Sequence, residues 1–66
     1  MKKIKFNRSI YSNETIEKTR MAYKNHAVTT VIYKQEYAII TFLKCKYDEE
    51  LTIKEFENYM IGVENT

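Results

Sequence analysis

The most reactive group in this sequence is a single cysteine with a basic residue on each side. Cys45 stands between Lys44 and Lys46, and nearby positive charge can lower the pKa of a thiol and make it nucleophilic. A nucleophilic cysteine also needs a base that a third group holds in place, and no such constellation is visible. We therefore expect Cys45 to pack as a small apolar residue at the end of a strand.

The other candidates for chemistry are one histidine and one acidic cluster. His26 could be a general base or a metal ligand, but one histidine and one cysteine cannot make a Cys/His zinc cluster. Asp48, Glu49 and Glu50 could bind a divalent ion, but they precede a predicted helix, whose N-terminus favours negative charge. Nucleotide-binding, redox and metalloprotease motifs are absent. We predict no catalytic residue, metal or cofactor, and no enzymatic activity.

Length and composition restrict the class of protein. The sequence has 66 residues, which we interpret as one domain spanning 1–66. One cysteine excludes an intramolecular disulfide, so stability must come from packing or from a partner. No run approaches the ~20 apolar residues of a membrane span, and no signal-peptide pattern opens the chain. We expect a cytoplasmic protein that does not enter a membrane.

Charge is unevenly distributed along the chain. Residues 1–46 contain ten Lys or Arg and three acidic residues, whereas residues 47–66 contain one Lys and six acidic residues. The simpler interpretation is a basic sheet balanced by an acidic helix, because charge runs are usually solvated faces. The alternative is a basic surface for an acidic partner.

Three segments have the pattern of strands. Residues 2–7 alternate between apolar and lysine side chains, which is typical of a half-buried strand. Residues 27–33 and 37–43 are rich in β-branched side chains, and the polar connection 34–36 has the length of a hairpin turn. The run 37–43 is the most apolar, which indicates a central strand.

A first helix is predicted to begin at Ser12 or Asn13, with acidic residues in its first turn. Its spacing places small residues in the middle of one apolar stripe, which would let the backbone approach a sheet closely. That stripe consists of Thr15, Ile16, Thr19, Ala22, Tyr23 and His26. Positive charge near His26 would suit the last turn.

A second helix is predicted from a capping box and a hydrophobic staple. Thr52 and Glu55 have the spacing of the box, and Leu51 and Phe56 have that of the staple. Gly62 is expected to end this helix as its C-cap.

This order, β-α-β-β-α, predicts an α/β (α+β) two-layer sandwich. A right-handed crossover defines the position of the first helix, and the hairpin makes the last two strands antiparallel. With the most apolar strand in the centre, we expect a three-stranded mixed sheet of order 2-3-1 with both helices on one face.

The face of the sheet without helices is the predicted binding surface. We expect large apolar side chains beside lysines on it, and such a patch usually marks an interaction site. An exposed edge strand also invites pairing with an extended peptide. The predicted partner-binding residues are Val31, Tyr33, Ile39, Leu43, Lys3 and Lys5.

Residues at the element junctions match the pattern of a known family. They are Asn7, Tyr11, Ile16, Ala22, Tyr23 and the segment Phe56-Glu57-Asn58. The chain resembles HxsD, the small accessory proteins of His-Xaa-Ser peptide-modification systems, over nearly its whole length. The resemblance implies a non-catalytic partner of a radical SAM enzyme or of its ribosomal precursor peptide.

We therefore expect a non-catalytic domain that binds a protein or peptide, and a homodimer is compatible with the same surface. One alternative is a nucleic-acid-binding protein that uses the basic N-terminal half, where aromatic and basic residues interleave. Another is a small inhibitor protein from a mobile element, which the size allows.

Overall fold

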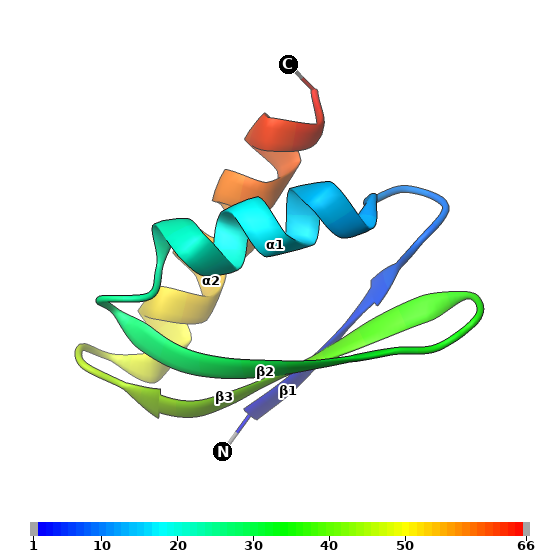
Figure 1. Cartoon of the computed structure of the whole chain (residues 1–66). Helices are drawn as coiled ribbons and strands as arrows, with labels where there is room; N and C mark the ends of the chain where they lie inside the picture. Colours follow the sequence, from blue (N-terminus) through cyan, green and yellow to red (C-terminus); the bar gives the residue numbers. More distant parts are fainter. Residues whose placement is uncertain (1, 66) are drawn as a thin grey trace.

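Three antiparallel strands and two helices make up the chain, as seen in a computed structural model that describes residues 2–65. In order they are β1 (Lys2–Asn7), α1 (Asn13–Ala22), β2 (Ala27–Tyr33), β3 (Tyr37–Cys45) and α2 (Glu49–Glu64). Both helices lie on the same side of the open sheet (Figure 1). The predicted α+β class and element order are confirmed.

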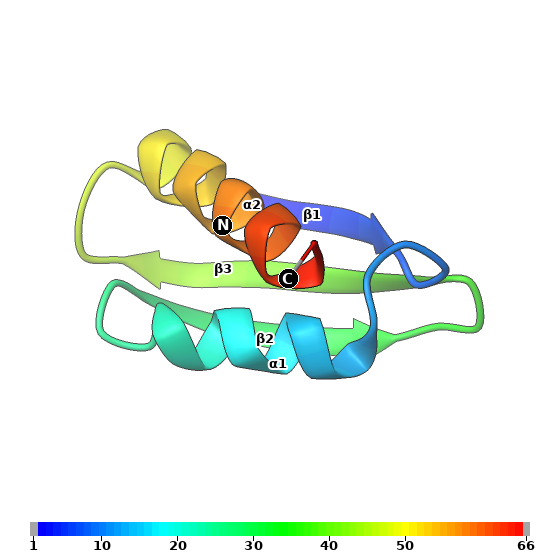
Figure 2. The same cartoon turned by 90° about the horizontal axis from the view of Figure 1, so that it is seen from above.

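The strand order is β1-β3-β2, so β3 is central, as the order 2-3-1 requires (Figure 2). The prediction of a mixed sheet was wrong, because β3 is antiparallel to both neighbours. The crossover through α1 makes β1 and β2 run in the same direction. A strand that forms a hairpin with β2 and lies between them must then oppose both.

The core lies between the helices and one face of the sheet. Ile40 and Phe42 of β3 are fully buried there, together with Ile16 of α1 and Phe56 of α2. The Phe56 ring meets the Phe42 ring edge-on, with centroids 5.1 Å apart. Edge-to-face pairs of this kind add to the free energy gained from burial alone.

Helix α1 begins where the sequence predicts. Ser12 is its N-cap, and its Oγ accepts a hydrogen bond from the Thr15 backbone N–H at 3.1 Å. Thr19 is fully buried and donates to the Thr15 carbonyl at 2.8 Å. The helix ends at Ala22, which is exposed, so the predicted stripe is too long and His26 lies in the turn that follows.

Helix α2 starts earlier than the capping box predicts. Asp48 is the N-cap, and its Oδ1 accepts from the Leu51 N–H at 3.2 Å. Thr52 is a buried residue within the helix. Leu51 is exposed, whereas the predicted hydrophobic staple requires it to be buried against Phe56. An aspartate followed by two glutamates satisfies the first turn better than Thr52 alone, because both the cap and the helix dipole favour those charges.

Helix α2 also ends later than predicted, because Gly62 lies within it and has no positive φ. Glu64 holds the last turn in place. Its carboxylate accepts from the Thr15 hydroxyl at 2.6 Å and from the Ser12 N–H at 3.2 Å. The end of α2 therefore supplies hydrogen-bond acceptors for the Ser12 N–H and the Thr15 hydroxyl at the start of α1.

The two possible caps of α2 can be separated by mutation. Asp48→Ala should lower the free energy of unfolding by about 1 kcal/mol, because the Leu51 N–H loses its acceptor. Glu55→Ala, the matched control, should change it by less than about 0.5 kcal/mol, since Glu55 is exposed on the helix surface. Urea denaturation measures both. A larger loss of stability for Glu55→Ala than for Asp48→Ala would show that the capping box of Thr52 and Glu55, and not Asp48, caps α2.

Gly62 offers a second test of the extent of α2. A Cβ at this position would meet no atom within 4 Å. We expect Gly62→Ala to raise the free energy of unfolding by about 1 kcal/mol, because alanine loses less backbone entropy in a helix. A decrease in thermal or urea stability would contradict the helical conformation of Gly62.

Candidate interaction surface

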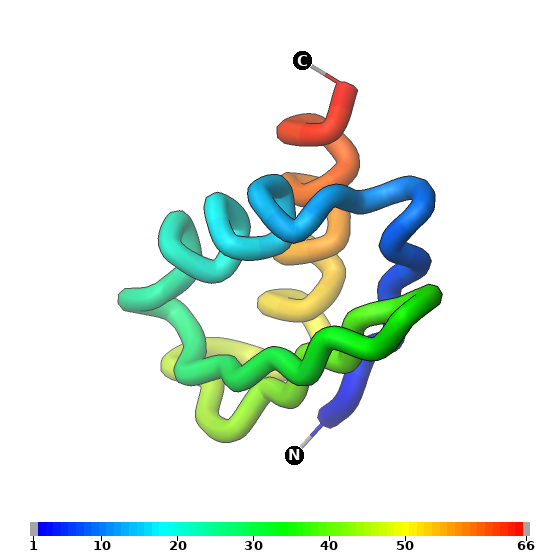
Figure 3. The backbone as a smooth tube through the Cα atoms, turned by 45° about the vertical axis from the view of Figure 1, so that its right-hand side comes forward, coloured from blue at the N-terminus to red at the C-terminus, as the bar shows by residue number. Residues whose placement is uncertain are grey.

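The sheet has one face that neither helix covers, as Figure 3 shows from another side. Ala38, Ile40 and Phe42 point toward the helices and are fully buried. Side chains alternate along a strand, so Tyr37 and Ile39 lie on the opposite, open face. There they are only half-buried.

The register of the strands identifies the rows of the open face. Ile39 is flanked by Lys5 of β1 on one side and by Ile32 of β2 on the other. Further along, Val28 pairs with Lys44. Val28 and Ile32 are 53% and 55% exposed, so the open face carries aliphatic side chains in contact with solvent.

Four of the six predicted binding residues belong to this face. Lys3, Lys5 and Ile39 lie in its rows, and Leu43, 43% exposed, lies where the β2–β3 register shifts.

Val31 and Tyr33 lie on the helix-covered face instead. Val31 pairs with buried Ile40 and packs against the core. The Tyr33 hydroxyl donates to the Glu17 carboxylate of α1 at 2.5 Å. Both alternating sets of β2 contain large apolar side chains, so alternation alone could not choose the buried one. The signal in the sequence was Glu17 on α1, because its carboxylate can accept a hydrogen bond from a tyrosine hydroxyl on the strand that this helix covers.

The only aromatic ring on the open face of the described strands is covered by a lysine. The Lys5 Nζ lies 4.6 Å from the centroid of the Tyr37 ring, a distance typical of a cation–π contact. Solvent on this face therefore meets aliphatic and polar side chains and lysines rather than an uncovered aromatic ring.

An arginine occupies the free edge of β2. The Lys34 N–H bonds the Tyr37 carbonyl, and bonding alternates along an antiparallel pair, so the backbone of Thr29 points away from β3. Arg20 donates to the Thr29 carbonyl at 3.0 Å and to its hydroxyl at 3.1 Å. Glu17 holds the same guanidinium at 2.9 and 3.0 Å. The Thr29 carbonyl is therefore not free to pair with an added strand at this edge.

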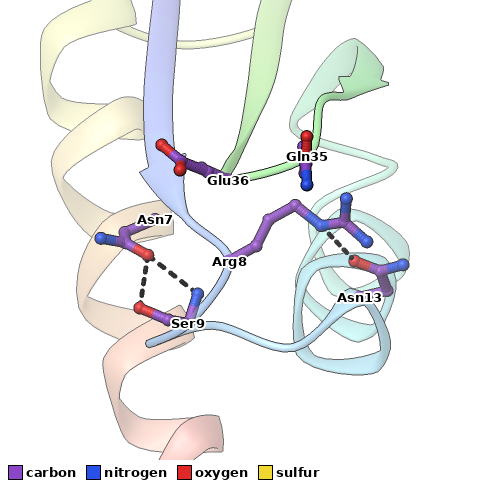
Figure 4. A pocket seen from close by; sticks show the side chains of 6 residues that line it. All are labelled: Asn7, Arg8, Ser9, Asn13, Gln35 and Glu36. Carbon is purple, nitrogen blue, oxygen red and sulfur yellow. Dashed lines mark hydrogen bonds between the residues drawn. The ribbon is translucent and has the colours of Figure 1, made fainter.

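A polar cavity of about 730 Å³ lies where the β1–α1 loop meets the hairpin turn (Figure 4). Its polar groups bond one another. Arg8 donates to Asn13 at 3.2 Å and to the Lys34 carbonyl, while the Asn7 side chain accepts from both the N–H and the hydroxyl of Ser9. These bonds tie two loops together, and they account for the cavity structurally.

The surroundings of Cys45 and His26 indicate structural rather than chemical roles. Burial, followed by the nearby Glu49 carboxylate, raises the pKa of the Cys45 thiol, which opposes nucleophilic reactivity at neutral pH. The His26 ring lies between those of Tyr23 and Tyr47, with centroids 5.4 and 5.7 Å away. Within residues 2–65, no three His, Cys, Asp or Glu side chains gather as metal ligands would.

No family model, curated protein or solved structure matches this sequence. In the part of the chain that the structure describes, neither helix combines the length and the apolar character needed to cross a membrane.

The bond between Tyr33 and Glu17 predicts a pH dependence. Burial, followed by this bond, raises the pKa of Tyr33 from 10.0 to about 12. The folded state then holds the phenolic proton more tightly than the unfolded state. This stabilisation is fully present below pH 10 and is lost as the pH rises from 10 to about 12. We expect the stability difference between the wild type and Tyr33→Phe to narrow over that interval.

Urea denaturation at successive pH values measures this difference. Glu17→Gln provides a second variant, in which the absorbance of tyrosinate should show an earlier ionisation of Tyr33. A wild-type advantage that stays constant through the interval would show that the Glu17 carboxylate does not hold the Tyr33 proton.

Proposed function

We propose that this chain is a non-catalytic interaction domain whose open sheet face binds an aliphatic and acidic segment of a polypeptide partner. The observation that carries the proposal is the set of exposed aliphatic side chains on the uncovered face, Val28, Ile32 and Leu43. The Thr30–Thr41 pair lies between Val28 and Ile32 on the same face. Exposed aliphatic side chains gathered on one face of a small protein usually mark an interaction site.

The charge of the same face supports an acidic partner. Lys3, Lys5 and Lys44 stand beside the aliphatic residues, and none of the three strands contains an Asp or Glu. Complementary charge steers a partner toward a surface and fixes its register. A segment that alternates aliphatic and acidic side chains satisfies both features.

The state of the edges favours binding to the face over strand addition. Arg20 already occupies the Thr29 carbonyl on the β2 edge, and the other edge strand, β1, carries Lys3 and Lys5. Charged side chains on an edge strand hinder pairing with a further strand.

A second copy of the chain is a poorer occupant of the face. Two open faces packed around a twofold axis would bring lysines from both copies together, with no carboxylate on either face to compensate. The accessory role beside a radical SAM enzyme or its precursor peptide stays a prediction that rests on the resemblance to HxsD.

Selection from a random peptide display library tests the proposed function. Peptides enriched on the wild type should combine aliphatic with acidic residues. Ile32→Asp should weaken their binding at least about tenfold, because it places a carboxylate in the apolar patch and repels acidic side chains. Leu51→Asp is the matched control, since Leu51 is equally exposed but lies on α2. Circular dichroism checks that both variants fold.

Equal weakening by both substitutions, or selected peptides without acidic residues, would refute the proposed function. Sedimentation equilibrium of the wild type decides the remaining alternative. We expect a monomer, and a dimer that Ile32→Asp dissociates would identify the occupant as a second copy.

A further inference from the structure

One end of the molecule gathers positive charge around a cavity of about 280 Å³. Lys24 and His26 come from the turn after α1, and Lys44 and Lys46 from the end of β3. The Lys46 N–H donates to the His26 carbonyl at 2.8 Å, so the backbone itself holds these two segments together. The cavity is therefore a fixed feature of the fold.

None of the lysines that line this cavity forms an ion pair with an acid in the described part of the chain. The two ion pairs found among residues 2–65 both lie on α1 and involve Lys18 and Arg20. No Asp or Glu lines the cavity. Uncompensated charge of one sign in a concave site attracts ligands of the opposite sign.

The chemistry of the lining selects an acceptor-rich ligand. Lys24, Lys44 and Lys46 line the cavity, and their ammonium groups can only donate hydrogen bonds. The Lys46 Nζ also lies 5.6 Å from the centroid of the Tyr47 ring. Lysine binds anions as a flexible point charge, so three lysines around one cavity suit several carboxylates better than a single planar one.

The position of the cavity connects it to the open face. Val28 lines it and also pairs with Lys44 on that face. A ligand held here would continue onto the open face, over Val28 and Thr30 toward Ile32.

Along the open face nucleic acid fits less well, because bases stack on exposed rings and the ring of Tyr37 lies under Lys5. Beside the cavity the exposed ring of Tyr47 lies near Lys46, so a nucleic acid is tested there directly.

We propose that the cavity lined by Lys24, Lys44 and Lys46 binds clustered carboxylates of an acidic polypeptide segment, which then crosses the open face toward Ile32. This inference rests on the proposed function for the second part of that path. It adds the direction of the partner, with its acidic cluster at the α1–β2 turn and its aliphatic residues over the sheet.

The experiment titrates short poly-L-glutamate into isotope-labelled protein and follows the backbone amides by NMR. The largest shifts should occur at Asn25, His26 and Lys46. The triple substitution Lys24→Gln, Lys44→Gln and Lys46→Gln should weaken binding about tenfold, as expected for three partly exposed charge pairs. The matched control carries Lys18→Gln, Lys34→Gln and Lys54→Gln, has the same net charge, and should bind within about twofold of the wild type.

Equal losses in both triple variants would overturn the proposal, since binding would then follow net charge alone. Tighter binding of an oligothymidylate through the same three lysines would instead identify a nucleic-acid site. The selected display peptides separate the two proposals. If Ile32→Asp abolishes their binding while the cavity triple leaves it unchanged, the open face binds a partner and the cavity inference is wrong.

Discussion

The ring of Phe56 is the contact on which the two layers depend. It is fully buried and meets Phe42 of the central strand, Phe6 of β1 and Tyr23 at the end of α1, with centroids 5.1, 6.5 and 5.6 Å away. One side chain thus fixes α2 against two strands and against the other helix. Because both helices converge on this ring, they occupy the same face of the sheet.

The packing of both helices on one face determines which surface of the sheet stays exposed. Two short helices complete one core and leave the second face of the sheet uncovered, with Val28 and Ile32 in solvent. The strands carry only basic charges, whereas α2 carries most of the acidic ones. The open face and the cavity beside it therefore share one sign of charge, and the acidic surface lies on the other layer.

Local patterns predicted the elements well, and competing patterns account for the errors. The Ser12 cap, the hairpin and the central position of β3 each follow from a few neighbouring residues. The start of α2 did not, because Asp48 and Thr52 both offer a cap and the acidic first turn favours Asp48. The end of α2 depends on Glu64, whose partners lie on α1 and are invisible to a local pattern.

The uncovered face of the sheet was predicted, but two of the six residues assigned to it, Val31 and Tyr33, lie on the other face. Lysine alternation placed Lys3 and Lys5 on the open face correctly, since both alternate with Ile4 and Phe6 along β1. In β2, apolar side chains occur on both faces, and the choice follows from tertiary contacts such as the bond between Tyr33 and Glu17. The alternation of side chains along a strand does not show which of its two faces a helix covers.

The central position of β3 also sets the order in which the chain can fold during synthesis. Strand β1 leaves the ribosome first, but its only strand neighbour follows 30 residues later, and that separation slows their pairing. The β2–β3 hairpin can form without β1. The core closes only when Phe56 and Met60 emerge, close to the end of the described chain. Until then the nascent chain exposes the apolar residues of both faces of its sheet, so the interval before α2 docks is when aggregation competes most with folding.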